Sequence, residues 1–110
     1  MKIFSAILLL ILSFNVSAND ASLRMEAQKK YYAECMRENG YKSKREYMAT
    51  MGLKPENLCS CITQVAANFF VDKDANYFLN PLAMPEPLKK NFLNVMTTYG
   101  DACMDRVRYK

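Results

Sequence analysis

The chain has 110 residues, a formal net charge of +4 and no histidine, and its acidic and basic residues are interspersed. This length is typical of one domain, and the mixed charges exclude the basic stripe of a nucleic-acid-binding protein. Without histidine, the chain lacks the usual general base and the usual metal ligand. We therefore expect no enzyme, no catalytic residues, no metal site and no cofactor, and no nucleic-acid partner.

Residues 1–18 have the pattern of a secretory signal peptide. Lys2 gives a positive start, residues 3–12 form an apolar run, and small residues up to Ala18 suit cleavage. A membrane anchor is the alternative, but a spanning helix needs roughly 20 apolar residues, which this run does not reach. We expect cleavage after Ala18, no stable membrane anchor afterwards, and a single helical domain over residues 19–110 in the periplasm or secreted.

Two helices are predicted in the first half of this domain. The first covers about residues 22–39, and Gly40 is expected to end it by taking a positive φ angle. The spacing Ser43-x-x-Glu46 then matches a capping box, in which the serine caps the helix start and the glutamate bonds back. It predicts a short second helix over about residues 44–51.

The stretch from Leu58 to Val71 contains no charged residue, and its apolar residues recur at the spacing of one helical face. Pro55 suits the first turn, where a missing N–H costs nothing. Most of the uncharged polar residues fall on one narrow line, namely Ser60, Gln64 and Asn68. A helix that is apolar nearly all round is a buried one, so this segment should be the central helix of the domain.

Four cysteines in a short exported chain indicate two disulfides. Cys59 and Cys61 are two positions apart, or roughly 200° around a helix axis, so they should bond different neighbours on opposite flanks. The neighbours are Cys35 before the central helix and Cys103 after it. We prefer the pairs Cys35–Cys61 and Cys59–Cys103 over the pairs Cys35–Cys59 and Cys61–Cys103.

Residues 72–87 break the helical pattern because Pro81, Pro85 and Pro87 forbid a continuous helix. We expect a packed, irregular crossover with one helical turn near residues 75–79. Functional groups are frequent on loops held by a rigid scaffold. The apolar residues of the crossover are therefore the candidate contacts with a partner: Tyr77, Phe78, Leu79, Leu82 and Met84.

A last helix is predicted from about Pro87 to Val107, since its apolar residues keep a regular spacing of four and three. No pair of short alternating segments indicates a β-hairpin. The expected fold is all-α, a small bundle of three main helices plus one short helix, held together by two disulfides.

The frame of Cys35, Cys59-x-Cys61 and Cys103 resembles that of small exported bacterial all-helical proteins, which are mostly uncharacterised. The resemblance implies the fold and the compartment, and it implies no particular activity. Some small disulfide-bonded helical periplasmic proteins are immunity proteins that block a rival's cell-wall or membrane toxin. This relation is an analogy of fold, because no motif of such a family occurs here.

The expected function is that of a small, non-enzymatic periplasmic protein that binds a protein partner, with an immunity or inhibitor protein against a secreted toxin as one form. The alternative is an envelope stress chaperone. A thiol-redox or copper-handling protein is a third hypothesis, but redox proteins more often carry Cys-x-x-Cys at a helix start. The sequence does not identify the partner.

Overall fold

The computed structural model describes the backbone of residues 2–108 and the side chains of residues 20–108. In this part of the chain every regular element is helical, which confirms the all-α fold. The elements are α1 (Lys2–Asn39), α2 (Lys42–Ala49), α3 (Pro55–Phe69), α4 (Ala75–Leu79), the 3₁₀ turn η1 (Pro81–Ala83) and α5 (Glu86–Arg108). The one helical turn expected in the crossover is α4.

Helix α1 begins at Lys2, well before residue 22, where the first helix was expected to start. The side chains of the predicted signal peptide, residues 1–18, lie outside the described residues. Among the described residues, no helix combines the length and the apolar character that a membrane span requires.

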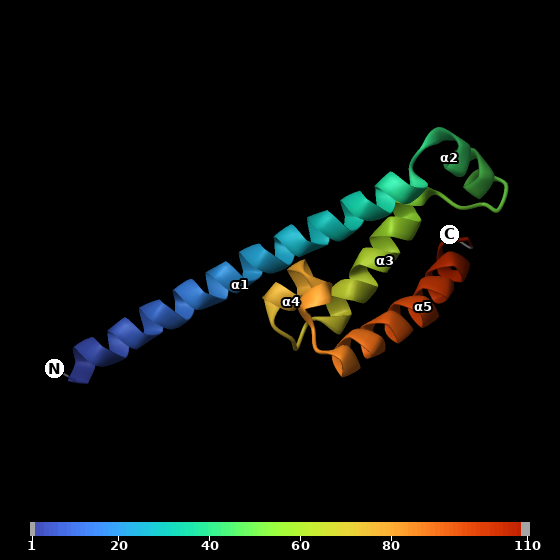
Figure 1. The fold of residues 1–110 in the computed structure, drawn as a ribbon. Coiled ribbons are helices and arrows are strands. Elements are labelled where there is room, and N and C mark those ends of the chain that lie inside the picture. Colours follow the sequence, from blue (N-terminus) through green and yellow to red (C-terminus); the bar gives the residue numbers. More distant parts are fainter. Residues whose placement is uncertain (1, 109–110) are drawn as a thin grey trace.

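The three long helices α1, α3 and α5 lie side by side, with α3 in the middle (Figure 1). Helix α3 packs against both α1 and α5, and α4 packs against α1. This arrangement confirms α3 as the central helix. Its line of uncharged polar residues (Ser60, Gln64 and Asn68) is exposed, so α3 is covered on its flanks but open along this line.

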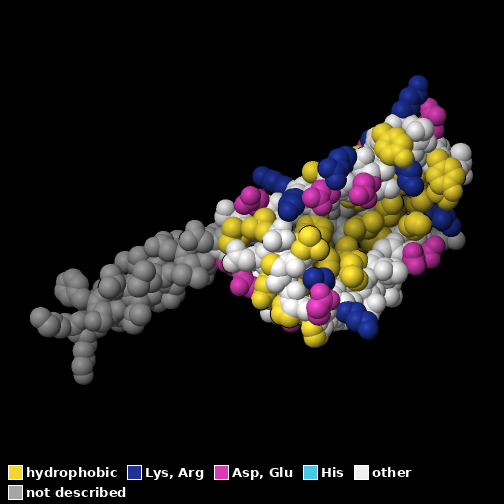
Figure 2. Space-filling view, in the orientation of Figure 1, with side chains coloured by type: hydrophobic (Ala, Val, Ile, Leu, Met, Phe, Trp, Pro, Cys, Tyr) yellow, Lys and Arg dark blue, Asp and Glu magenta, His cyan; other side chains and the backbone are white. Residues whose placement is uncertain are grey.

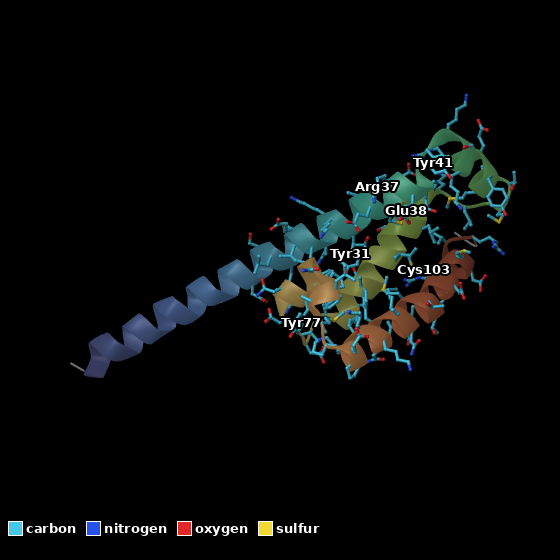
Figure 3. The ribbon with its side chains drawn as sticks, viewed as in Figure 1. Tyr31, Arg37, Glu38, Tyr41, Tyr77 and Cys103 are labelled. Atoms are coloured by element: carbon cyan, nitrogen blue, oxygen red, sulfur yellow. A yellow bond between two sulfur atoms is a disulfide. The ribbon has the colours of Figure 1, made fainter. Side chains whose placement is uncertain are left out.

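The largest cluster of buried side chains is aromatic and joins α1, α3, α4 and α5. The rings of Phe70 and Phe78 are stacked with centroids 5.0 Å apart, and Phe92 lies 5.0 Å from Phe70. Tyr31 of α1 adds a fourth ring, 5.2 Å from Phe78 (Figure 3). Because α4 is too short to be stable alone, we attribute its position to Phe78 in this cluster.

A second cluster of buried side chains holds α2 and the C-terminal part of α5 against α3. Met48, Leu53, Leu58 and Cys103 form its buried part. The two clusters occupy opposite ends of α3, so the central helix supports both the α4 end and the α2 end of the domain.

The predicted capping box at the start of α2 is wrong. The helix begins at Lys42, and Tyr41 occupies the cap position without a side-chain hydrogen bond. Ser43 therefore lies inside the first turn. Helix α1 ends at Asn39, as predicted, but the positive φ angle expected at Gly40 is wrong, because among the described residues Gly52 is the glycine with positive φ, at 72°. Gly40 instead donates its N–H to the Met36 carbonyl at 2.6 Å and so continues the α1 pattern for one residue.

Candidate functional site

Two disulfides connect the central helix to its two neighbours. Cys35 of α1 bonds Cys59, and Cys61 bonds Cys103 of α5. The prediction that Cys59 and Cys61 bond different helices is confirmed, but the preferred pairing is wrong. The spacing of the two cysteines shows only that they lie on opposite flanks of α3. The spacing does not reveal the handedness of the three-helix arrangement, which places α1 on the Cys59 flank and α5 on the Cys61 flank.

This disulfide pattern is typical of a protein that folds in an oxidising compartment. Among the described residues no cysteine is free. Cys59 and Cys103 are buried, so one sulfur of each bridge is shielded from solvent. The two bridges tie α1 and α5 to opposite flanks of α3 and so fix the walls of any groove between them.

The five predicted contact residues of the crossover differ in their exposure to solvent. Phe78 and Met84 are only 1% and 4% exposed and belong to the aromatic core, so their assignment as partner contacts is wrong. Tyr77 and Leu79 are half-buried against the same core. Leu82 is 79% exposed and is the one member that stands out on the surface.

Leu79 and Leu82 line one side of a cavity of about 340 Å³ that we call the apolar groove. Its other sides come from α1 and α5. The lining residues are Lys30, Tyr31 and Glu34 of α1, Leu79 to Leu82 of the crossover, and Lys89, Phe92 and Leu93 of α5. Figure 2 shows hydrophobic side chains gathered in a hollow between α1 and α5 on the face that carries α4.

Leu93 is the most exposed apolar residue that α5 contributes to the apolar groove, at 58%. It directly follows Phe92, which is buried, so it lies about 100° around the helix from the core-facing line. Leu93 and the residues of α1 were not predicted as contacts from the sequence. An apolar residue outside the regular spacing of α5 is the signal that could have identified Leu93.

The polar groups at the edge of the apolar groove are partly satisfied within the chain. Lys30 donates to the Leu79 carbonyl at 3.1 Å, and Lys89 donates to Glu86 at 3.2 Å. The Tyr31 hydroxyl is buried and has no hydrogen-bond partner among the described residues. Burial, assisted by the Glu34 carboxylate, raises the pKa of the Tyr31 phenol well above its ordinary value.

This arrangement can bind apolar side chains, because two exposed leucines border a concave surface above a tightly packed aromatic core. Surface leucines in isolation need no explanation, whereas leucines around one cavity are typical of a binding surface. Comparison with known proteins identifies no relative: no family model, no curated protein and no solved structure matches the chain.

Proposed function

We propose that this protein is a small, exported, non-enzymatic protein that binds a protein partner through the apolar groove. The partner would present apolar side chains that cover Leu82 and Leu93 when it binds. The observation that carries the proposal is the exposure of these two leucines on either side of one cavity. Export to the periplasm or the exterior is part of the proposal, and the two disulfides support it.

A rigid scaffold favours such a role. The aromatic cluster lies directly below the groove, since Tyr31 and Phe92 belong to both. The flanking helices are fixed by disulfides on both sides of α3. A surface that is already ordered loses little conformational entropy on binding, which increases the affinity available from a small apolar area.

The test is affinity capture of the exported protein after chemical cross-linking in its native host, with two variants and one control. Leu82→Asp and Leu93→Asp place a charge in the groove and should abolish capture. Val71→Asp is the matched control, because Val71 is 72% exposed and does not line the groove. A captured protein counts only when the purified pair re-forms the complex and both groove variants weaken it. Equal loss with the control would contradict the role of the groove.

If the protein is an immunity protein, its loss should have a measurable effect on competition. Deletion of the gene should then sensitise the host to a toxin-bearing competitor, and the Leu82→Asp variant should fail to restore resistance. Unchanged competition after deletion would rule out this form. The chaperone alternative instead predicts that binding of a hydrophobic dye rises at low pH and that unrelated unfolded clients bind. A groove of defined shape above a packed core favours one partner over many clients.

A further inference from the structure

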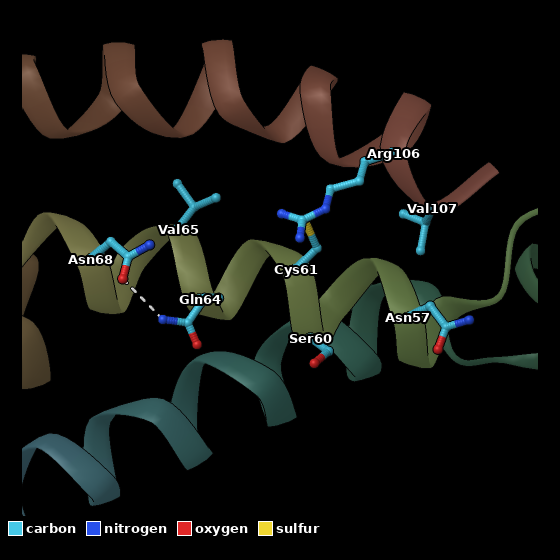
Figure 4. A pocket seen from close by; sticks show the side chains of 8 residues that line it. All are labelled: Asn57, Ser60, Cys61, Gln64, Val65, Asn68, Arg106 and Val107. Atoms are coloured by element: carbon cyan, nitrogen blue, oxygen red, sulfur yellow. Dashed lines mark hydrogen bonds between the residues drawn. The ribbon is translucent and has the colours of Figure 1, made fainter. Parts of the chain in front are cut away.

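A second cavity, of about 400 Å³, lies between α3 and the C-terminal part of α5 (Figure 4). It shares no lining residue with the apolar groove. One side of it is a row of uncharged polar residues on α3, which we call the polar row and which consists of Asn57, Ser60, Gln64 and Asn68. The volume falls in the range of pockets that hold small ligands.

The cavity contains one positive charge. Arg106 of α5 lines the cavity, and its guanidinium reaches across towards Cys61 of α3 (Figure 4). No acidic residue lines the cavity, and Arg106 takes part in none of the ion pairs of the described residues. A guanidinium carries five N–H donors in a planar fork that matches a carboxylate in two parallel hydrogen bonds. The cavity therefore has the charge and the donors to select an anionic group.

The polar row suits a peptide backbone. Carboxamides and hydroxyls both donate and accept hydrogen bonds, as peptide groups do. Within the row, Gln64 donates to Asn68 at 2.9 Å, which leaves the remaining donors and acceptors for solvent or a ligand. From Ser60 to Asn68 the helix rises by about 12 Å, the length of roughly three or four residues of extended chain.

The disulfide between Cys61 and Cys103 fixes the distance between the two sides of this cavity. Cys61 itself lines the cavity, and Cys103 lies about one helical turn before Arg106 on α5. The guanidinium is therefore carried by a backbone that is covalently held against α3. A site held in this way loses little freedom when a ligand binds.

We propose that this cavity binds the C-terminus of a peptide chain. The terminal carboxylate pairs with Arg106 beside Cys61, and the preceding peptide groups extend along the polar row towards Asn68. The carboxylate is the recognised group, because it accepts two parallel charge-assisted hydrogen bonds from a guanidinium, which are stronger than those to a neutral amide. The source is either a free short peptide or the terminus of a folded protein.

The experiment is a titration of the full disulfide-bonded protein with a mixture of N-acetylated tripeptides that end in a free carboxylate, followed by NMR. The same peptides with amidated C-termini are the second arm, and acetate and inorganic phosphate are the third. A protein with an accessible C-terminus is the fourth arm, which distinguishes a protein terminus from a free peptide. We expect shifts of the Asn and Gln side-chain amides of the polar row with the carboxylate peptides and none with the amidated peptides, acetate or phosphate.

Arg106→Gln should weaken binding at least about tenfold, which corresponds to loss of hydrogen bonds to a charged group. Arg108→Gln is the matched control, because Arg108 is exposed on the same helix and does not line the cavity. Equal binding of acid and amide peptides, or no shifts with either, would overturn the proposal. Binding of acetate or phosphate as tight as that of the peptides would also overturn it, because the polar row would then contribute nothing. None of these results depends on the apolar groove.

Discussion

Arg24 of α1 donates a hydrogen bond of 2.6 Å to the backbone carbonyl of Phe70, the C-cap residue that directly follows α3. A second N–H of the same guanidinium donates to the Lys73 carbonyl at 2.5 Å, and Asp20 accepts a third hydrogen bond at 2.8 Å. One side chain thus satisfies two carbonyls of the turn between α3 and α4. Since α4 belongs to the crossover and ends at Leu79, which lines the apolar groove, Arg24 helps to position one wall of the groove.

Replacement of Arg24 by methionine should lower the free energy of unfolding by about 1.5–3 kcal/mol, because two carbonyls lose a charged donor. Methionine retains most of the apolar stem, so the loss reflects the hydrogen bonds. Urea unfolding followed by circular dichroism measures the change. Lys29→Met is the matched control on the exposed side of α1 and should stay within about 0.5 kcal/mol of the wild type. Equal stability of the two variants would show that the Arg24 contacts contribute nothing.

Two glycines should respond to alanine in opposite directions. A Cβ at Gly40 would lie 2.6 Å from the backbone oxygen of Met36, an atom that cannot move without disturbing α1. Gly40→Ala should therefore destabilise the protein by about 1–3 kcal/mol, the usual cost of overpacking. A Cβ at Gly100 meets nothing within 4 Å, so Gly100→Ala should stabilise α5 by about 0.5–1 kcal/mol. Thermal unfolding of both variants checks the signs, and a stabilised Gly40→Ala would contradict the close contact.

The long helices could be predicted from the sequence because each depends on local periodicity. Pro55 marked the start of α3, and the uncharged stretch after it indicated a central position. The short elements were harder, because α2 begins without a side-chain cap and the Ser43 pattern is a coincidence of spacing. Local signals decide long helices, whereas tertiary packing decides short ones.

The candidate site was predicted only in part, because the crossover has no regular period. In a helix, spacing tells which residues face the core, but between α4 and η1 Phe78 turns inward while Leu82 turns outward. Neither position is distinguished in the sequence. Contributions from distant segments could not be predicted either, since Arg106 lines the same cavity as the polar row of α3 only because α5 packs against α3.

Peptide mapping without reduction should recover Cys35 linked to Cys59 and Cys61 linked to Cys103. Because the inner cysteines are separated by Ser60 alone, partial acid hydrolysis or a protease that cleaves between them is needed to distinguish the pairings. Removal of either bridge by paired alanines should cost roughly 3–4 kcal/mol, and the bridge that spans 42 residues should cost about 0.5 kcal/mol more than the one that spans 24. A recovered peptide that links Cys35 to Cys61 would contradict the arrangement of the three helices.

The Tyr31→Phe substitution should reduce the loss of protein stability at high pH without lowering the stability near neutral pH. Near neutral pH the variant should be at least as stable as the wild type, because the lost hydroxyl is buried without a partner. The pKa of the phenol is raised in the folded state by burial and by Glu34, so the unfolded state releases its proton first as the pH rises. The wild type should keep its full stability below about pH 10, the ordinary tyrosine pKa, and lose it as the pH climbs further.

Urea unfolding at about pH 8 and about pH 11, on either side of the ordinary tyrosine pKa, measures this loss. The fall in the free energy of unfolding should be smaller in Tyr31→Phe than in the wild type. Tyr99→Phe is the matched control, since Tyr99 is exposed on α5, and it should retain the wild-type fall. An identical fall in all three proteins would show that the Tyr31 phenol is open to solvent in the folded state. The aromatic ring would then line the apolar groove with its hydroxyl hydrated, and a partner would have to displace that water.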